Sequence, residues 1–135
     1  MLSIWEYREN KRNYPGFHIA GNDSGIDNIA RKLKSIKANK IAILLSPVTN
    51  KMLKAPNNKA GKAKIKSYSR LVIEQSMAKN DIFTITGKDH GIMIKASRKR
   101  INEIAKSLIG TKRGDGDYCI GAPKTGLLWF WWIPK

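Results

Sequence analysis

The sequence lacks the features that mark several large protein classes. Cys119 is the only cysteine, which excludes an internal disulfide and is typical of a reducing compartment. The longest apolar run, Leu127 to Ile133, has seven residues, whereas a membrane helix needs about twenty. The N-terminal segment has no apolar core of the kind that a signal peptide needs. We therefore expect a cytoplasmic protein that does not enter a membrane.

Motifs of nucleotide and metal chemistry are also missing. The sequence contains no Gly-x-Gly-x-x-Gly and no phosphate-binding loop with Gly-Lys-Ser/Thr. The available metal ligands are His18, His90, Cys119 and scattered carboxylates, with none at the i, i+4 spacing of a helical site. Asp115 and Asp117 stand in a glycine-rich turn that offers fewer oxygen ligands than an EF-hand-like loop requires. We expect neither a cofactor nor a bound metal.

Three side chains are candidates for reaction chemistry. Cys119 stands within a short apolar run and is predicted to be a small buried side chain. His18 and His90 are the only groups whose ordinary pKa lies near neutrality, so a small ribonuclease would have to use them with a lysine. The alternative places His18 in a strand and His90 at the tip of a hairpin. Because nothing in the spacing brings the histidines together, we expect a protein that is not an enzyme.

Acidic residues are scarce and unevenly placed. The 135 residues include 26 Lys or Arg against 10 Asp or Glu, a formal net charge of +16. Between Asp27 and Glu74 there is no acidic residue but there are twelve Lys or Arg. The length predicts a single domain over residues 1–135. Residues 48–64 show neither helical nor alternating apolar periodicity, and we interpret them as a mobile basic loop.

Two segments have the apolar spacing of amphipathic helices. The first runs over residues 24–39, with a capping box formed by Ser24 and Asp27 and a left-handed stop at Asn39. The second runs from its N-cap at Ser97 to a C-terminal glycine at Gly110. Each helix is expected to pack one face against a sheet.

The other apolar runs predict β-strands. Residues 41–45 are apolar on both faces, as in a covered central strand, and a five-residue loop from Gly87 to Gly91 predicts a hairpin. The expected strands are Phe17 to Ala20, Ile41 to Leu45, Ile82 to Thr86, Ile92 to Ala96, Tyr118 to Ile120 and Leu127 to Ile133, with Ile65 to Ile73 ambiguous. The order predicts an α+β fold, with a mostly antiparallel sheet of about five to six strands and two amphipathic helices packed on one face.

Basic residues in two places form the candidate binding surface. The first turn of the second helix carries Arg98, Lys99 and Arg100, although positive charge opposes the helix dipole there. With the free amides of that turn they would form an anion site, and the alternative is a solvated basic face. The predicted partner-binding residues are Lys51, Lys54, Lys59, Lys62, Lys64, Lys66, Arg70, Arg98, Lys99 and Arg100.

The C-terminal segment is rich in aromatic side chains. As a strand it places Trp129 and Trp131 on one face and Phe130 and Trp132 on the other. A strand buried on both faces is the favoured interpretation. The alternative is a partly exposed aromatic row that binds a protein or stacks on unpaired bases.

Three segments together resemble those of a group of small bacterial proteins. They are a Tyr-Pro-Gly-Phe-His-Ile segment leading into a capped helix (Tyr14 to Ile36), a Gly-Asp-Tyr-x-Ile-Gly turn (Gly116 to Gly121) and a Leu-Trp-Phe-Trp-Trp tail (Leu128 to Trp132). The resemblance implies a stand-alone α+β domain and carries no established activity. Such small single-domain chains are similar in style to the immunity proteins that accompany bacterial toxins.

Composition and motifs therefore leave three functions in order of preference. The first is a non-enzymatic inhibitor, a toxin-immunity protein, whose basic face binds an acidic protein partner such as a cognate toxin domain. The second is a nucleic-acid-binding protein that uses the same lysines to neutralise phosphates. The third is a ribonuclease that uses His18 and His90.

Overall fold

The computed structural model describes residues 1–8, 15–36, 40–53, 64–77 and 80–133. Within these ranges the chain forms two α-helices, α1 (Asp23–Lys34) and α2 (Arg98–Arg113), and a short 3-10 helix, η1 (Asn50–Met52). The strands are β1 (Leu2–Tyr7), β2 (Phe17–Gly21), β3 (Lys40–Leu44), β4 (Ile65–Tyr68), β5 (Arg70–Gln75), β6 (Phe83–Lys88), β7 (Gly91–Ala96), β8 (Tyr118–Ala122) and β9 (Gly126–Phe130). The predicted α+β class is confirmed.

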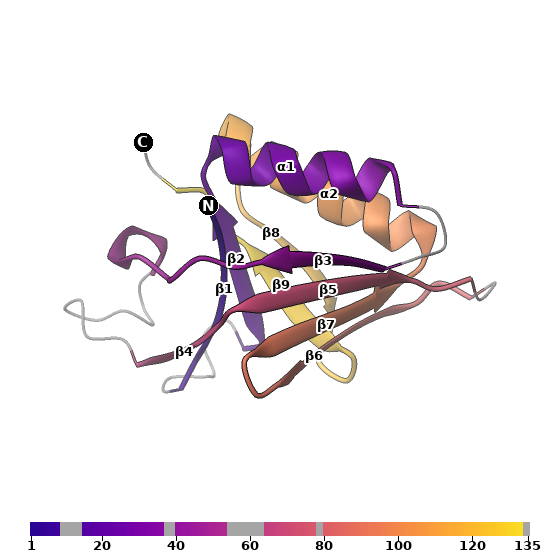
Figure 1. Cartoon of the computed structure of the whole chain (residues 1–135), viewed down its shortest axis with the longest axis horizontal. Coiled ribbons are helices and arrows are strands. Elements are labelled where there is room, and N and C mark those ends of the chain that lie inside the picture. Colours follow the sequence, from indigo (N-terminus) through magenta and orange to yellow (C-terminus); the bar gives the residue numbers. More distant parts are fainter. Residues whose placement is uncertain (9–14, 37–39, 54–63, 78–79, 134–135) are drawn as a thin grey trace.

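The strands form two mixed sheets, so the single, mostly antiparallel sheet of five to six strands was an imprecise prediction. Sheet A has the order β4-β1-β2-β9-β8 and sheet B the order β3-β5-β7-β6. The β2–β9 and β5–β7 pairs are parallel, and the other pairs are antiparallel. Strands of the two sheets cross at a steep angle (Figure 1).

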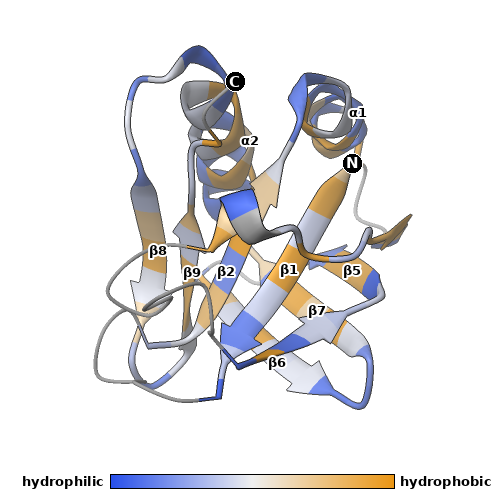
Figure 2. Cartoon of the chain, turned by 90° about the vertical axis from the view of Figure 1, so that its left-hand side faces the viewer, coloured by the Kyte–Doolittle hydropathy of each residue, from blue (hydrophilic) through white to orange (hydrophobic). Residues whose placement is uncertain are grey.

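The helices explain why one predicted sheet is in fact two. α1 carries the chain from β2 in sheet A to β3 in sheet B, and α2 returns it from β7 in sheet B to β8 in sheet A. An antiparallel hairpin precedes each helix, β1–β2 before α1 and β6–β7 before α2. The order of two strands, a helix and a strand therefore occurs twice, as β1-β2-α1-β3 and as β6-β7-α2-β8. The helices lie side by side over the same end of the sheets (Figure 2).

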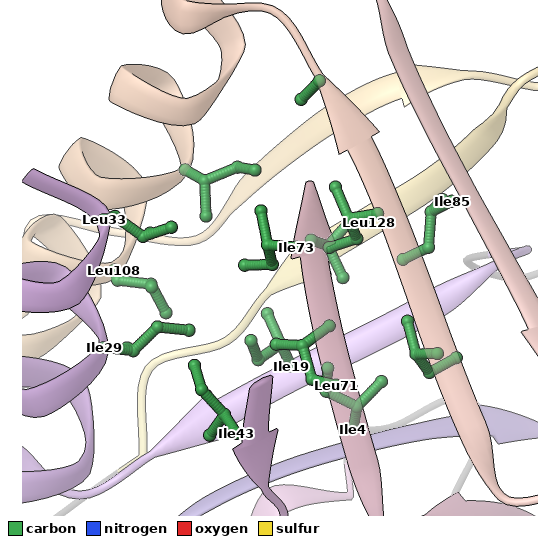
Figure 3. Packing of buried hydrophobic residues seen from close by; sticks show 14 of the residues in the cluster. Ile4, Ile19, Ile29, Leu33, Ile43, Leu71, Ile73, Ile85, Leu108 and Leu128 are labelled. Carbon is green, nitrogen blue, oxygen red and sulfur yellow. The ribbon is translucent and has the colours of Figure 1, made fainter. Parts of the chain in front are cut away.

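The main core fills the space between the sheets and the helices. Sheet A contributes Ile4 and Ile19, sheet B contributes Leu71 and Ile73, and Leu108 enters from α2 (Figure 3). These side chains are almost completely buried. Removal of this apolar surface from water is the main force that holds the two sheets together.

A second, smaller core lies on the other face of sheet A. Trp5, Tyr7 and Trp131 point to this face and pack with Met52 of η1, which has no exposed surface. The Oγ of Ser3 donates to the carbonyls of residues 46 and 47, at 2.8 and 3.1 Å, and so holds the segment that leads into η1 on sheet A. The start of the predicted basic loop, residues 48–53, therefore covers sheet A, while residues 54–63 lie outside the described residues.

Both helices differ from prediction at their ends. α1 has Asn22 as its N-cap, with Oδ1 accepting from the Gly25 amide at 2.9 Å, in place of the predicted Ser24–Asp27 capping box. The predicted stop at Asn39 lies outside the described residues. α2 begins after Ser97 as predicted but continues past Gly110 to Arg113, where Gly114 (φ 77°) takes the left-handed conformation.

Gly110 is needed for a different reason. A Cβ on this residue would lie 2.4 Å from the hydroxyl oxygen of Tyr118, so the glycine lets β8 approach the helix.

Two strand predictions need correction. β3 is an edge strand of sheet B, with Ala42 and Leu44 exposed, and is not the covered central strand that its apolar sequence suggested. β6 and β7 form the predicted hairpin, but the turn between them has only two residues, Asp89 and His90. Asp89 has φ 56°, a left-handed conformation that Asp tolerates better than most residues.

Candidate functional site

The predicted partner-binding cations lie on different parts of the molecule. Lys51 is exposed on η1, which covers sheet A, and Lys64 and Lys66 lie at β4, the edge strand of the same sheet. Arg70 is exposed on β5 in sheet B. These cations thus come from η1 and from the regions of β4 and β5, and the two strands belong to different sheets. Lys54, Lys59 and Lys62 lie outside the described residues.

Arg98 has a role within the fold. Its guanidinium donates to the carbonyl of Ile36 at 3.1 Å and to those of Leu33 and Lys34 at 3.5 and 3.4 Å. Carbonyls at the end of a helix have no partner within the helix and carry its negative dipole. The positive charge at the start of α2 thus stabilises the end of α1.

Asp81 compensates for the cations in the first turn of α2. Its carboxylate accepts from Ser97 Oγ at 2.9 Å and forms a salt bridge with Arg100, which also pairs with Glu103. The hydrogen bond from Ser97 and the nearby charge of Arg100 lower the pKa of Asp81 below its ordinary value. The acidic group expected near a helix N-terminus is therefore supplied by the segment that precedes β6. Of the three predicted cations in this turn, Lys99 is the one without a hydrogen bond or salt bridge among the described residues.

The outer face of sheet B is a surface that sequence reasoning missed, apart from Arg70. Its residues alternate along each strand with buried core residues. Strand register arranges them in three rows across the sheet, which are Lys40-Glu74-Lys95-Thr84, Ala42-Val72-Met93-Thr86 and Leu44-Arg70-Gly91-Lys88. The middle row is mostly apolar, and both flanking rows carry cations.

A sequence signal for this face exists in β7. Met93 and Lys95 alternate with the buried Ile92 and Ile94, which is the pattern of a sheet with one solvated face. The signal is absent in β3, where the outward residues Ala42 and Leu44 are as apolar as the inward ones.

The two histidines occupy unrelated environments. His18 is completely buried in β2, its ring lies nearly parallel to those of Trp5 and Trp131, and its Nδ1 accepts from Trp131 Nε1 at 2.8 Å. His90 is exposed in the β6–β7 turn of the other sheet. The structure does not bring them together as an acid–base pair.

Cys119 is exposed on β8, so the prediction of a buried side chain was wrong. Neighbouring atoms still shield the thiol enough to raise its pKa. Asp117, a candidate metal ligand, accepts from the backbone amide of Trp132 at 2.8 Å. Among the described residues there is no group of three or more His, Cys, Asp or Glu side chains that could hold a metal ion.

The aromatic tail is mostly buried, as the favoured interpretation expected. Phe130 packs in the main core and Trp131 in the core over sheet A, while Trp129 is half-buried. The indole of Trp129 donates to the carbonyl of Pro15 at 2.8 Å. Only Trp132, at 41% exposure and beyond the end of β9, offers a large aromatic surface to solvent in this segment.

Neither of the described helices is long and apolar enough to cross a membrane. No protein-family model matches the chain, and comparison with curated proteins gives no significant match.

Proposed function

We propose that this chain is a non-enzymatic, protein-binding inhibitor of the immunity type, which neutralises a bacterial toxin in the cytoplasm through a cationic surface. The partner is an acidic protein, such as a cognate toxin domain.

The observation that carries the proposal is that three exposed cations, Lys40, Lys51 and Arg70, form no salt bridge with a carboxylate among the described residues. The salt bridges among the described residues use only Arg100 and Lys112 as cations. Lys40, Lys51 and Arg70 all come from the acid-free segment, are exposed and form no salt bridge within the described part of the chain. Within the described residues these three cations are therefore not used to neutralise the protein's own carboxylates.

Unpaired surface cations suit a protein that must find its partner quickly. Complementary charge raises the association rate and disfavours partners of the wrong charge, and a few buried anchors then supply most of the affinity. Such a protein needs no catalytic group. It inhibits the toxin by binding to it.

A toxin-like protein is first sought among the genes adjacent to this one, and the test then uses the purified full chain and the catalytic domain of that protein. We expect a stable one-to-one complex and loss of toxin activity. Single-stranded and duplex oligonucleotides are measured in parallel, because the same cations would also attract phosphates. A nanomolar oligonucleotide complex without any complex with the toxin domain would overturn the proposal in favour of nucleic-acid binding.

A further inference from the structure

The outer face of sheet B exposes apolar side chains that no described element covers. Leu44 is 86% exposed and Met93 is 36% exposed, and Val72 lies between their strands on β5. In Figure 1 the strands of sheet B lie in front, and the helices cover a different side of the molecule. Exposed apolar surface on a folded sheet, bordered by polar residues, is typical of an interaction site.

The middle row, Ala42-Val72-Met93-Thr86, has charged residues on both sides, and Leu44 stands at the end of one flanking row. Lys40 and Lys95 stand on either side of Glu74 in one flanking row, and Arg70 and Lys88 stand on either side of Gly91 in the other. Four cations and one carboxylate leave the face with an excess of three positive charges. None of these groups forms a salt bridge among the described residues.

Gly91 leaves the face hollow. A Cβ on Gly91 would meet only the carbonyl oxygen of Lys88, at 3.7 Å, so the space above it is open. Gly91 lines a shallow depression of about 380 Å³, whose walls also include Arg70, Val72, Lys88 and Met93. A partner side chain can therefore enter beside the cations.

We propose that the outer face of sheet B is the surface that docks the acidic partner. It accepts an apolar stripe that is bordered on both sides by carboxylates. The stripe covers Val72 and Met93, and the carboxylates meet Lys40, Arg70 and Lys88. This inference rests on the proposed function, because it names the surface through which the toxin is bound.

Other occupants fit the face less well. A second copy of this chain would bring two faces of the same positive charge together, which costs free energy. A nucleic-acid strand would find no aromatic ring among the outward residues of the four strands on which to stack a base. It would also place phosphates beside Glu74 and leave Leu44 and Met93 in a polar interface.

The surface is tested with a synthetic amphipathic peptide that carries one stripe of Leu flanked by Glu. The peptide is titrated into the isotope-labelled full chain, and amide chemical shifts are recorded. We expect the largest changes on β3, β5 and β7, and no binding by a control peptide in which every Glu is Lys. No change on these strands at millimolar peptide, or tighter binding of single-stranded oligonucleotide on the same face, would overturn the inference.

Matched variants then show which side chains contribute to the binding free energy. Met93→Glu and Leu44→Glu place a carboxylate within the apolar surface, and each is expected to weaken peptide and toxin binding at least about tenfold. Met77→Glu changes another methionine, 71% exposed, which lines a different depression beside Ser97 and Lys99, and is expected to leave binding unchanged. Arg70→Glu and Lys124→Glu make the same comparison for charge. Arg70→Glu is expected to weaken binding, whereas Lys124→Glu, in the exposed β8–β9 turn, is expected to leave binding unchanged.

The outcomes separate this inference from the proposed function. Undiminished toxin neutralisation by folded Met93→Glu and Leu44→Glu proteins would overturn the docking surface alone. Peptide binding on sheet B without a complex with the toxin domain would overturn the immunity function and leave the surface standing. Circular dichroism of each variant establishes that it is folded.

Discussion

The imidazole of His18 contacts two indole rings, those of Trp5 and Trp131, and accepts a hydrogen bond from the second. Sequence alone correctly placed His18 in a strand, because the residues on both sides of it are apolar. It could not identify Trp131, which lies 113 residues further along the chain, as the donor. Cys119 marks a similar limit. Its short strand has too few residues for alternation to define which side faces the core.

Replacing Trp131 with Phe tests the role of the His18 contact. The variant removes the indole N–H and leaves a buried imidazole nitrogen without its donor, so we expect a loss of about 1–3 kcal/mol in the free energy of unfolding. Trp132→Phe changes an exposed indole and is expected to cost less than about 0.5 kcal/mol. Urea unfolding followed by circular dichroism measures both. Equal effects of the two substitutions would show that the hydrogen bond contributes little.

At the scale of elements, both amphipathic helices and most strands were predictable, because their periodicity is local. The ends of the helices were not. Gly110 has the residue type of a helix stop, yet α2 continues through it. The glycine is needed there because a side chain would collide with Tyr118. The basic first turn of α2 was correctly seen as unusual. Its partners, the end of α1 and Asp81, come from other segments and could not be predicted.

Arg98 and Lys99 are adjacent cations for which different roles are expected. Arg98→Ala removes the donors to the last carbonyls of α1 and is expected to lower the free energy of unfolding by about 1 kcal/mol. Lys99→Ala is expected to change stability by less than about 0.5 kcal/mol. Chemical denaturation of the two variants makes the comparison. If Arg98→Ala is as stable as the unmodified protein, its contacts with α1 are not structural and it remains available to a partner.

Asp81 makes stability depend on pH. Its folded-state pKa is lower than the ordinary value of about 3.9. Its contribution is therefore complete above that value and is lost as pH falls through the lower, folded-state pKa. We expect Asp81→Asn to be less stable than the unmodified protein at neutral pH, with the difference disappearing in acid. Thermal unfolding across acidic pH measures this.

Asp115→Asn is the matched control for that experiment, because Asp115 is exposed and its carboxylate forms no hydrogen bond or salt bridge among the described residues. A stability difference for Asp81→Asn that persists unchanged at the most acidic pH would contradict the proposed role of its carboxylate.

At the scale of the whole molecule, the class of the fold could be predicted but not its division into two sheets. Strand pairing such as that of β2 with β9 joins distant segments, and nothing in either strand specifies the other. The basic character of the chain was evident from composition. The outer face of sheet B was not evident, because its cations Lys40, Arg70, Lys88 and Lys95 come from four strands and come together only when the sheet forms.

Attraction between opposite charges is expected to bring this protein to its partner. The most direct test is the association rate of the full chain with the catalytic domain of the proposed toxin partner, measured by stopped flow as salt is increased. We expect the rate to fall at least about tenfold between about 0.05 and about 0.5 M NaCl, with a smaller change in the dissociation rate. An association rate independent of salt, or no association at any salt concentration, would contradict the central claim.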